Sequence, residues 1–343
     1  MPGEAATAQG RRAASERFLA RAGWQDAARA HLAGDASERS YARLRRGQDT
    51  AVLMDAPPGG ADDPADFVAI AAHLAAIGLS PPQVLAQDLQ AGFLLLEDLG
   101  DGLFARLLAA DPAREMALYA AATDVLVHLQ AHPAPPGLPD LSARDWAAAA
   151  ALVLEAYVPA ATGAAPPTAD LVAALAAGLA RHADGPRVLI LRDYHAENLL
   201  LLPGREGVAA VGLLDFQLGQ MGQPGYDLVS LVQDARRDVV PGTAEAMVRR
   251  FQAATGAADM APALAVLGAQ RALRIIGVFA RLCTHAGKPG YLAMLPRVWG
   301  HLQANLAHPA LVDLAGICHA LIPAPTPAIL ERIARQCPPP PPR

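Results

Sequence analysis

The chain has 343 residues, more than one hydrophobic core usually organises, so we expect two lobes. Its net charge of −5 and the lack of a basic patch argue against nucleic acid as a partner. No apolar run reaches membrane-spanning length without a charge or a proline, so no membrane span is expected. The N-terminus lacks a signal-peptide pattern, and three widely spaced cysteines suit reduced thiols. We therefore expect a cytoplasmic protein.

The first hundred residues predict a small unit of mixed helices and strands. A helix is expected at Arg11–Ala22, with Phe18 and Leu19 facing inward, and a polar turn at Glu97–Asp101 ends the unit. Between them we expect a small-residue turn at 31–37, strands at 40–45, 51–54, 84–86 and 93–96, and a helix at 65–78.

From residue 103 onward the pattern is mainly helical. A long amphipathic helix is expected at Ala113–Ala131, and the segment Arg187–Phe216 interrupts the helices with short strands and loops. The residues from Gln336 to Arg343 are nearly all proline and should form a tail that packs nowhere. The other expected helices are 143–158, 171–182, 226–234, 243–255, 262–281, 291–305 and 311–321.

Within the interrupting segment, polar residues lie at the edges of strongly hydrophobic runs. Asp193 follows a run of aliphatic residues, Asn198 precedes four leucines, and Asp215 lies inside a third apolar run. A carboxylate in such surroundings costs desolvation energy unless a charge offsets it. Two carboxylates and an amide carbonyl are oxygen ligands that suit Mg²⁺ better than zinc or copper. The pattern therefore predicts a phosphoryl-transfer site.

The spacing of these residues matches the catalytic loop of protein kinases, in which an Asp and an Asn are separated by four residues and a later Asp holds the metal. Alone, Asp193 could cap a turn and Asp215 could end a strand; the joint spacing favours a site. Phosphoryl transfer depends on positioning and charge. We therefore predict that Asp193 orients the acceptor hydroxyl, while Asn198 and Asp215 hold the Mg²⁺ of bound ATP.

The segment Leu191–Asn198 resembles the catalytic loop of the aminoglycoside phosphotransferase/choline kinase-like superfamily, which usually reads His-Gly-Asp-x-His-x-x-Asn. Gly212–Asp215, followed by Gly222–Leu228, is similar to its metal-binding segment, and Leu96–Gly100 resembles its adenine-binding connector. The resemblance extends from about Gly34 to at least residue 237 and implies the architecture of that superfamily.

That architecture is an α+β, bilobal, protein-kinase-like fold. Residues 1–98 would form a small N-terminal nucleotide-binding lobe with an antiparallel sheet plus a helix. Residues 99–335 would form the larger, mainly helical catalytic and substrate-binding lobe, and 336–343 a disordered proline-rich tail. The residues that the resemblance assigns to the nucleotide are Gly34, Asp35, Ala36 and Ser37 over the phosphates, and Glu97 and Leu99 at the adenine.

Several stretches look closer to one branch, the anomeric cell-wall sugar kinases acting on N-acetylmuramate and N-acetylglucosamine. They are Gly34–Ser37 with Arg39 and Arg43, Val52–Pro58, Leu191–Leu199 and Tyr226–Asp238. This likeness implies ATP-dependent phosphorylation of the anomeric hydroxyl, which yields a sugar 1-phosphate for peptidoglycan recycling. The implied partners are a small-molecule amino sugar and a nucleotide, and we expect a monomer.

Kinases of this superfamily usually bind the phosphates with a lysine on the third strand of the N-terminal lobe. This chain has no lysine at that place. Lys288 is the only lysine and falls in the helical region, while Met54 occupies about the place where the lysine would be. Arg43 or Arg45, on the neighbouring strand, could reach the α- and β-phosphates with a bidentate guanidinium. We favour Arg43, with a surface arginine as the alternative.

Other polar residues are candidates for acceptor binding or for support of the loop. Arg236 and Arg237 should end a helix, where cations interact favourably with the dipole, or else grip the lactyl carboxylate of muramate. His195 is expected to brace the catalytic loop, and Asp227 to be buried against the loop or its backbone N–H groups. The candidate substrate-binding residues are Arg192, Gln217, Arg236 and Arg237.

Two alternative functions stay open. An aminoglycoside or other small-alcohol phosphotransferase of the same fold would need an acidic acceptor pocket, and the C-terminal helices show no obvious Asp/Glu cluster. A catalytically dead nucleotide-binding regulatory module is suggested by the missing lysine. The complete set of Asp193, Asn198 and Asp215 argues against that module.

Overall fold

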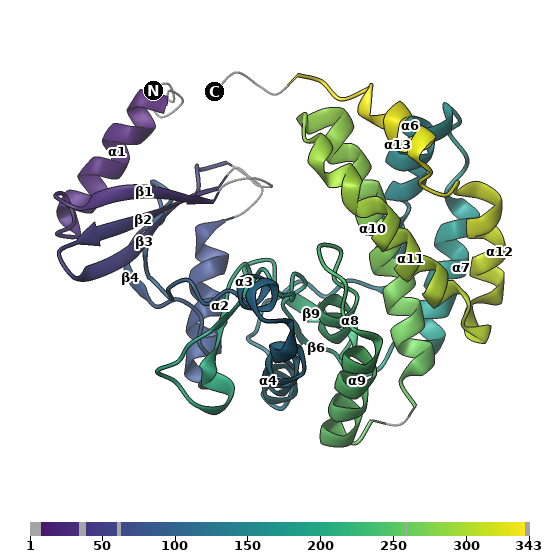
Figure 1. Cartoon of the computed structure of the whole chain (residues 1–343), viewed down its shortest axis with the longest axis horizontal. Helices are drawn as coiled ribbons and strands as arrows, with labels where there is room; N and C mark the ends of the chain where they lie inside the picture. The colour runs from purple at the N-terminus through teal and green to yellow at the C-terminus, as the bar shows by residue number, and fades with distance from the viewer. Residues whose placement is uncertain (1–7, 34–38, 60–62, 258, 340–343) are drawn as a thin grey trace. The chain divides into compact units, whose positions relative to one another are not determined.

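The computed structural model describes residues 8–33, 39–59, 63–257 and 259–339. The chain forms two compact units, the first from Met1–Arg114 and Ala196–Gly219, the second from Glu115–His195 and Gln220–Arg343. This division differs from the expected single boundary after residue 98, because the segment 196–219 returns to the first unit. The predicted α+β class is confirmed, with a sheet in the first unit and mainly helices in the second (Figure 1).

The first unit is built on a five-stranded antiparallel sheet with the order β1-β2-β3-β5-β4. The four predicted strands are confirmed, but β1 was not predicted, because its sequence ARAHLA has no β-branched residue and no clear alternation. Residues 31–33 of the expected turn end β1, and residues 34–37 lie outside the described residues. The strands are β1 (Ala28–Ala33), β2 (Ser40–Arg46), β3 (Asp49–Asp55), β4 (Val84–Asp88) and β5 (Phe93–Glu97).

Helices cover this sheet because β5 is apolar on both faces. Phe18 and Leu19 of the first helix are buried as predicted, and the Phe18 ring stacks on Phe93 of β5 with centroids 5.7 Å apart. The second helix begins where the Asp63 carboxylate accepts the Ala65 N–H. The helices of this unit are α1 (Ala8–Arg21), α2 (Pro64–Ala76), α3 (Phe104–Ala110) and the 3₁₀ turn η1 (Pro112–Arg114).

The second unit is a helical assembly around α10 (Ala261–Ala286), which packs against α5, α7, α8 and α11 (Figure 1). Among the described helices, α10 alone is long and apolar enough to cross a membrane, but most of it is buried, as in a core helix. The other helices are α4 (Glu115–Gln130), α5 (Ala143–Ala150), α6 (Val158–Thr162), α7 (Ala169–His182), α8 (Tyr226–Val232), α9 (Pro241–Thr255), α11 (Leu295–Leu306), α12 (Val312–Leu321) and α13 (Pro327–Ala334), with the shorter turns η2 (Val153–Tyr157), η4 (Pro289–Met294) and η5 (Pro309–Leu311).

Two expectations for this unit need correction. The helix expected at 143–158 is interrupted, because it passes into the π-helical turn η2 before α6 begins. The expectation that the chain packs nowhere from residue 336 is wrong for its first residues: Gln336 Nε2 donates to the Ala160 carbonyl (2.7 Å), and Cys337 packs partly buried against the core. No helix was predicted at Pro327–Ala334, where the structure has α13. This helix leads the chain to Gln336 and Cys337.

The central segment forms two nested strand pairs. In the second unit, β6 (Val188–Ile190) pairs with β9 (Gln220–Gly222), and in the first unit β7 (Leu199–Leu201) pairs with β8 (Val211–Leu213). A 3₁₀ turn, η3 (Gly207–Ala210), leads into β8. The chain therefore passes between the units through residues 191–198 and 214–219, and these two connections carry the predicted catalytic motif.

Candidate active site

In the first unit, the β7–β8 pair brings Asn198 and Asp215 to the same end of one hairpin. Leu199 lies opposite Leu213, and the Leu214 N–H donates to the Asn198 carbonyl (2.9 Å). Asp215 follows directly after Leu214. The structure therefore places the two predicted metal-binding residues on adjacent chain segments, although 16 residues lie between them in the sequence.

Asp215 has a backbone conformation that a non-glycine residue rarely adopts, with φ at 55°. The next residue, Phe216, is fully buried and stacks on Phe67 of α2, with ring centroids 4.8 Å apart. The Phe216 carbonyl also accepts the Gly219 N–H (2.8 Å). Such strain persists only where the surroundings hold it, and here the aromatic stack fixes the turn that presents the Asp215 carboxylate.

Two side chains of the first unit donate hydrogen bonds to Asp215. Arg39 Nη2 lies 3.0 Å from Oδ1, and Gln217 Nε2 lies 2.9 Å from the same oxygen. The Arg39 side chain is 8% exposed and that of Asp215 40%. The cation offsets the cost of a carboxylate in an apolar hairpin, as the sequence required. Sequence reasoning anticipated an arginine near the phosphates but considered Arg43 and Arg45 for this place and favoured Arg43.

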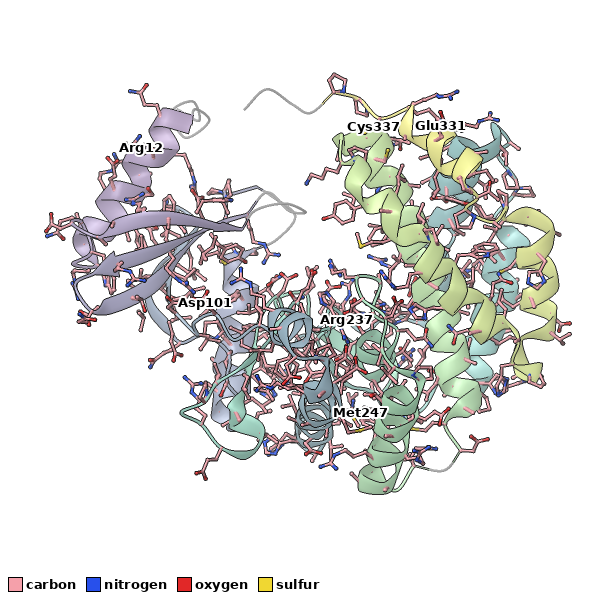
Figure 2. The ribbon with its side chains drawn as sticks, viewed as in Figure 1. Arg12, Asp101, Arg237, Met247, Glu331 and Cys337 are labelled. Atoms are coloured by element: carbon pink, nitrogen blue, oxygen red, sulfur yellow. The ribbon has the colours of Figure 1, made fainter. Side chains whose placement is uncertain are left out.

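Arg43 instead contacts the connector that follows β5. Its Nη2 lies 2.9 Å from Asp98 Oδ1, its Nη1 lies 2.9 Å from Asp101 Oδ1, and Nη2 also donates to the Gly100 carbonyl (Asp101 is labelled in Figure 2). Asp98 is nearly buried, so the pair with Arg43 stabilises the turn. The structure thus gives Arg43 a bracing position and brings Arg39, rather than Arg43, to Asp215.

The other nucleotide-binding candidates are placed only in part. Glu97 ends β5; its N–H donates to the Gln83 carbonyl (2.8 Å), and its carboxylate pairs with Arg205. The Leu99 side chain lies against Gly212 of β8, where an added Cβ would be 3.1 Å from it. The remaining candidates, Gly34, Asp35, Ala36 and Ser37, lie outside the described residues.

In the second unit, Asp227 holds the loop that carries Asp193. Its two carboxylate oxygens accept the backbone N–H groups of Leu191 (2.6 Å) and Arg192 (2.9 Å), and its side chain is fully buried. The Asp193 N–H donates to the Leu191 carbonyl (2.9 Å). Burial raises the pKa of Asp227 to about 7, although the two N–H groups act in the opposite direction. The expected burial of Asp227 against the loop is confirmed.

The following residues anchor the same loop to other helices. The Tyr194 hydroxyl donates to the Ala122 carbonyl of α4 (2.8 Å). His195 is 2% exposed, and its Nε2 lies 3.0 Å from Arg236 Nη1. Burial, and then the charges of Arg236 and Arg271, lower the pKa of His195 well below its usual value. The imidazole is therefore neutral and accepts a hydrogen bond from Arg236, and this contact supports the predicted bracing role of His195.

Arg236 and Arg237 do not end a helix, because α8 stops at Val232. The helix-dipole explanation for these two arginines is therefore wrong. Arg237, labelled in Figure 2, donates to Glu115 Oε2 and to the Tyr119 hydroxyl, both at 2.8 Å. Both partners lie on α4, and the Glu115 side chain is only 7% exposed. Arg237 thus serves packing within the second unit.

Arg192 is the other described non-glycine residue with a positive φ, at 72°. Sequence reasoning missed another arginine, Arg274 of α10. Burial lowers the pKa of Arg274, and the charge of Arg192 lowers it further, which places the two arginines near one another. An arginine within the apolar helix α10 can be noticed in the sequence. The proximity of Arg274 to Arg192, which lies on a distant loop, cannot.

The oxygen donors of the first unit suit one kind of metal. Among the described residues, no three His, Cys, Asp or Glu side chains gather into a metal site of their own. An amide and a carboxylate at one hairpin edge fit Mg²⁺, which is usually held by one or two protein ligands together with substrate phosphates. The chemistry of Asn198 and Asp215 therefore fits a magnesium–nucleotide complex.

Known proteins resemble this chain along most of its length. The model of the phosphotransferase enzyme family matches residues 29–265. A Caulobacter vibrioides protein named N-acetylmuramate/N-acetylglucosamine kinase is 39% identical, with 92% of this chain and 98% of that protein covered. A Pseudomonas aeruginosa protein of the same name is 34% identical, with 89% and 93% covered.

The fold is also that of solved kinases. The structure of a choline kinase from Streptococcus pneumoniae superposes with a TM-score of 0.61 at 13% identity, covering 90% of this chain and 100% of that one. This likeness confirms the predicted protein-kinase-like fold. Together with the family match and the 39% identical relative, it leads to one assignment. The chain belongs to the phosphotransferase enzyme family and is a phosphotransferase.

Proposed function

We propose that this chain is an ATP- and Mg²⁺-dependent kinase that phosphorylates the anomeric hydroxyl of N-acetylmuramate, N-acetylglucosamine or both. The product would be the sugar 1-phosphate, and the reaction would serve peptidoglycan recycling. The observation that carries the proposal is the set of Asp193, Asn198 and Asp215 in a chain 39% identical to a kinase named for these sugars. The loop and hairpin contacts of these residues support it.

The proposed metal ligands are Asn198 and Asp215. Arg39 and Gln217 donate hydrogen bonds to Asp215 Oδ1 and so orient the carboxylate that would hold the metal. Bound Mg²⁺ would neutralise charge on the β- and γ-phosphates. Gln217 thereby orients a ligand rather than contacting the sugar, which differs from its expected place among the substrate-binding residues.

We propose that Arg39 supplies the cation that the missing lysine provides in related kinases. Its contact with Asp215 places a buried guanidinium beside the proposed metal ligand. A planar guanidinium can bind phosphate oxygens in a bidentate way. Arg43 is held by Asp98 and Asp101, so its role is to fix the connector. A cation at Asp215 also weakens the case for a catalytically dead module.

The adenine would bind to the connector after β5. Since the Glu97 N–H donates to the Gln83 carbonyl, the backbone of Glu97 has only its carbonyl oxygen left to accept a hydrogen bond from the adenine. The Leu99 N–H would donate a hydrogen bond to the adenine. The segment Gly34–Ser37 would cover the phosphates.

The three cysteines are free thiols, which supports the proposed cytoplasmic location. We also propose that the protein is a monomer whose partners are small molecules, an amino sugar and a nucleotide.

Asp193 would orient the acceptor hydroxyl and accept its proton. An anomeric hydroxyl is more acidic than an ordinary alcohol, so a carboxylate is a sufficient base. The hydrogen bonds from Leu191 and Arg192 to Asp227 fix the backbone on which Asp193 lies. Accurate placement of this kind supplies much of the rate in phosphoryl transfer.

The test is to incubate the purified chain with MgATP and, separately, N-acetylmuramate, N-acetylglucosamine, choline and aminoglycosides, with ³¹P NMR of the products. The proposal predicts an anomeric phosphate on an N-acetyl sugar. Turnover of an aminoglycoside or choline in preference to both sugars would instead favour the small-alcohol alternative. ATP binding without turnover of any acceptor would favour the dead module.

A further inference from the structure

Arg192 occupies a backbone position that disfavours it. Its φ of 72° lies in the left-handed region, where a side chain is strained and glycine is not. The backbone is fixed on both sides: the Arg192 N–H donates to Asp227 Oδ1, and the Arg192 carbonyl accepts the Ser230 hydroxyl (3.2 Å). The related catalytic loop usually has glycine here. An arginine at this position needs a compensating use for its side chain.

The guanidinium of Arg192 has no such use within the described part of the protein. The side chain is half-buried, and its Nε is fully buried without a hydrogen-bond partner. In the same described ranges, Arg192 forms no side-chain hydrogen bond or ion pair. A buried, unpaired donor on a cation is costly, so the arrangement favours an anionic ligand.

Arg274 of α10 supplies a second guanidinium beside the first. It is also half-buried, and its side chain has no hydrogen-bond or ion-pair partner among the described residues. Burial lowers the pKa of Arg274, and the charges of Arg192 and, less strongly, Arg281 lower it further. Tyr226 and Asp193 act in the opposite direction, so both of these groups face Arg274 as well.

The local charge balance is therefore positive beside the proposed base. Asp193 lies near Arg192 and Arg274, and the nearby Arg271 is buried. Among the described residues, Arg271 makes a long contact with the Gln233 carbonyl (3.4 Å) and has the buried carboxyl group of Asp227 close to it. An added anion would therefore be stabilised here. Two guanidinium groups on different elements can bind a single carboxylate from two sides.

We propose that Arg192 and Arg274 bind a carboxylate on the acceptor, next to the hydroxyl that Asp193 orients. The inference rests on the proposed function and makes it more specific: an N-acetyl amino sugar that carries a carboxylate, such as the lactyl ether of muramate, is preferred to its neutral counterpart. Arg236 and Arg237, first considered for this carboxylate, contact His195, Glu115 and Tyr119 instead.

The carboxylate of the acceptor fits this pair better than a phosphate of the nucleotide. Both arginines belong to the second unit, which carries the acceptor base Asp193. The proposed phosphate-binding residues, Arg39 and the pair Asn198 and Asp215, belong to the first unit. The two assignments predict different kinetics, because a phosphate contact would affect every acceptor and the KM for ATP alike.

The experiment uses two acceptors of nearly equal size, N-acetylmuramate and its neutral carboxamide. The ratio of their kcat/KM values and the ratio of their calorimetric Kd values are measured for the full chain and three variants. Arg274→Gln removes one guanidinium, and Arg192→Gly removes the other while relieving the backbone strain. Arg281→Ala is the matched control, since it removes an exposed arginine two turns further along α10.

We expect Arg274→Gln and Arg192→Gly each to lower the preference for the carboxylate about tenfold or more, mainly through KM and Kd. Arg192→Gly should unfold at the same temperature as the unmodified chain or higher, so its loss cannot be ascribed to misfolding. Arg281→Ala should keep both ratios.

Unchanged ratios in both variants would overturn the inference, as would equal losses for both acceptors with a raised KM for ATP. If the unmodified chain phosphorylates neither sugar, the proposed function fails, and the Kd ratios alone decide about the arginine pair. A preference for N-acetylmuramate in binding that disappears in Arg274→Gln would then retain the carboxylate site. No such preference in binding would remove it.

Discussion

Arg39 and Asp215 form an ion pair across 176 residues of sequence, with Arg39 Nη2 3.0 Å from Asp215 Oδ1. The arginine comes from the residue before β2, and the carboxylate from the turn after β8. Their contact links the sheet of the first unit to the hairpin that carries the proposed metal ligands. It also offers a cation in a chain that has one lysine, far along the sequence.

Replacing Arg39 should therefore impair nucleotide use. We expect Arg39→Ala to lower kcat/KM for ATP about 100-fold, because a preorganised charge near the transferred phosphoryl group is lost. Arg39→Lys should recover part of this loss by restoring the charge without the bidentate geometry. Steady-state kinetics with varied ATP provides the measurement.

Two other arginines of β2 serve as controls. Arg45 is exposed, so Arg45→Ala should leave the kinetics unchanged. Arg43→Ala should lower the free energy of unfolding by about 1–3 kcal/mol, because Asp98 is left nearly buried without its cation. If Arg43→Ala instead raised the KM for ATP as much as Arg39→Ala does, Arg43 would be the phosphate-binding cation.

The Arg237–Glu115 pair should contribute to stability. Arg237→Ala would leave the Glu115 carboxylate buried and without its cation, so we expect the free energy of unfolding to fall by about 3 kcal/mol. The matched control is Arg250→Ala, since the pair of Arg250 with Asp124 joins α9 to the same helix α4 but is exposed at both ends and should be worth about 1 kcal/mol or less. Equal effects of the two variants in chemical denaturation would contradict this account.

His195 should make the protein less stable in acid. Its pKa is lowered in the folded chain, so the unfolded chain binds a proton first as the pH falls below 6.5. The contribution of the neutral His195 to the free energy of unfolding is complete above pH 6.5. It is lost below that pH, by about 1.4 kcal/mol for each pH unit. Unfolding free energies of the unmodified chain and of His195→Gln, compared between pH 5 and pH 8, test this. A constant difference would show that His195 is not held neutral.

Asp227 should have the opposite pH dependence. Its pKa is raised from 3.8 to about 7, so the folded chain keeps a proton that the unfolded chain has already released. This contribution to stability is present below pH 4 and is lost as the pH rises toward 7.

The variant Asp227→Asn lacks this titration and should be less stable at every pH, because its amide cannot accept both backbone N–H groups. The difference in unfolding free energy between the two proteins should shrink between pH 4 and pH 7. A difference that grows over this range would mean that the two N–H donors outweigh the burial of the carboxylate.

Much of the fold followed from local sequence patterns. Most helices of both units and four of the five strands of the first unit's sheet were expected from periodicity, and the spacing of Asp193, Asn198 and Asp215 pointed to phosphoryl transfer before any contact was known. The burial of Asp227 was also foreseen, because a carboxylate in an apolar helix must find backbone donors.

The contacts that could not be predicted join distant segments. Arg39 and Arg43 differ by four positions, yet one contacts Asp215 and the other Asp98, and no local pattern distinguishes them. The same holds for Arg237, whose partners on α4 lie more than a hundred residues earlier. The strand β1 was missed for another reason: neighbouring strand pairing, rather than β-propensity, stabilises its alanine-rich sequence.

The central claim is that Asp193 directs phosphoryl transfer to an anomeric hydroxyl. The most direct measurement is ³¹P NMR of the product that the unmodified chain and Asp193→Asn form from MgATP and N-acetylmuramate. We predict a phosphate on the anomeric oxygen with the unmodified chain, and a rate about 10³-fold lower with Asp193→Asn at an unchanged melting temperature. A phosphate on any other oxygen, or undiminished turnover by Asp193→Asn, would contradict the account.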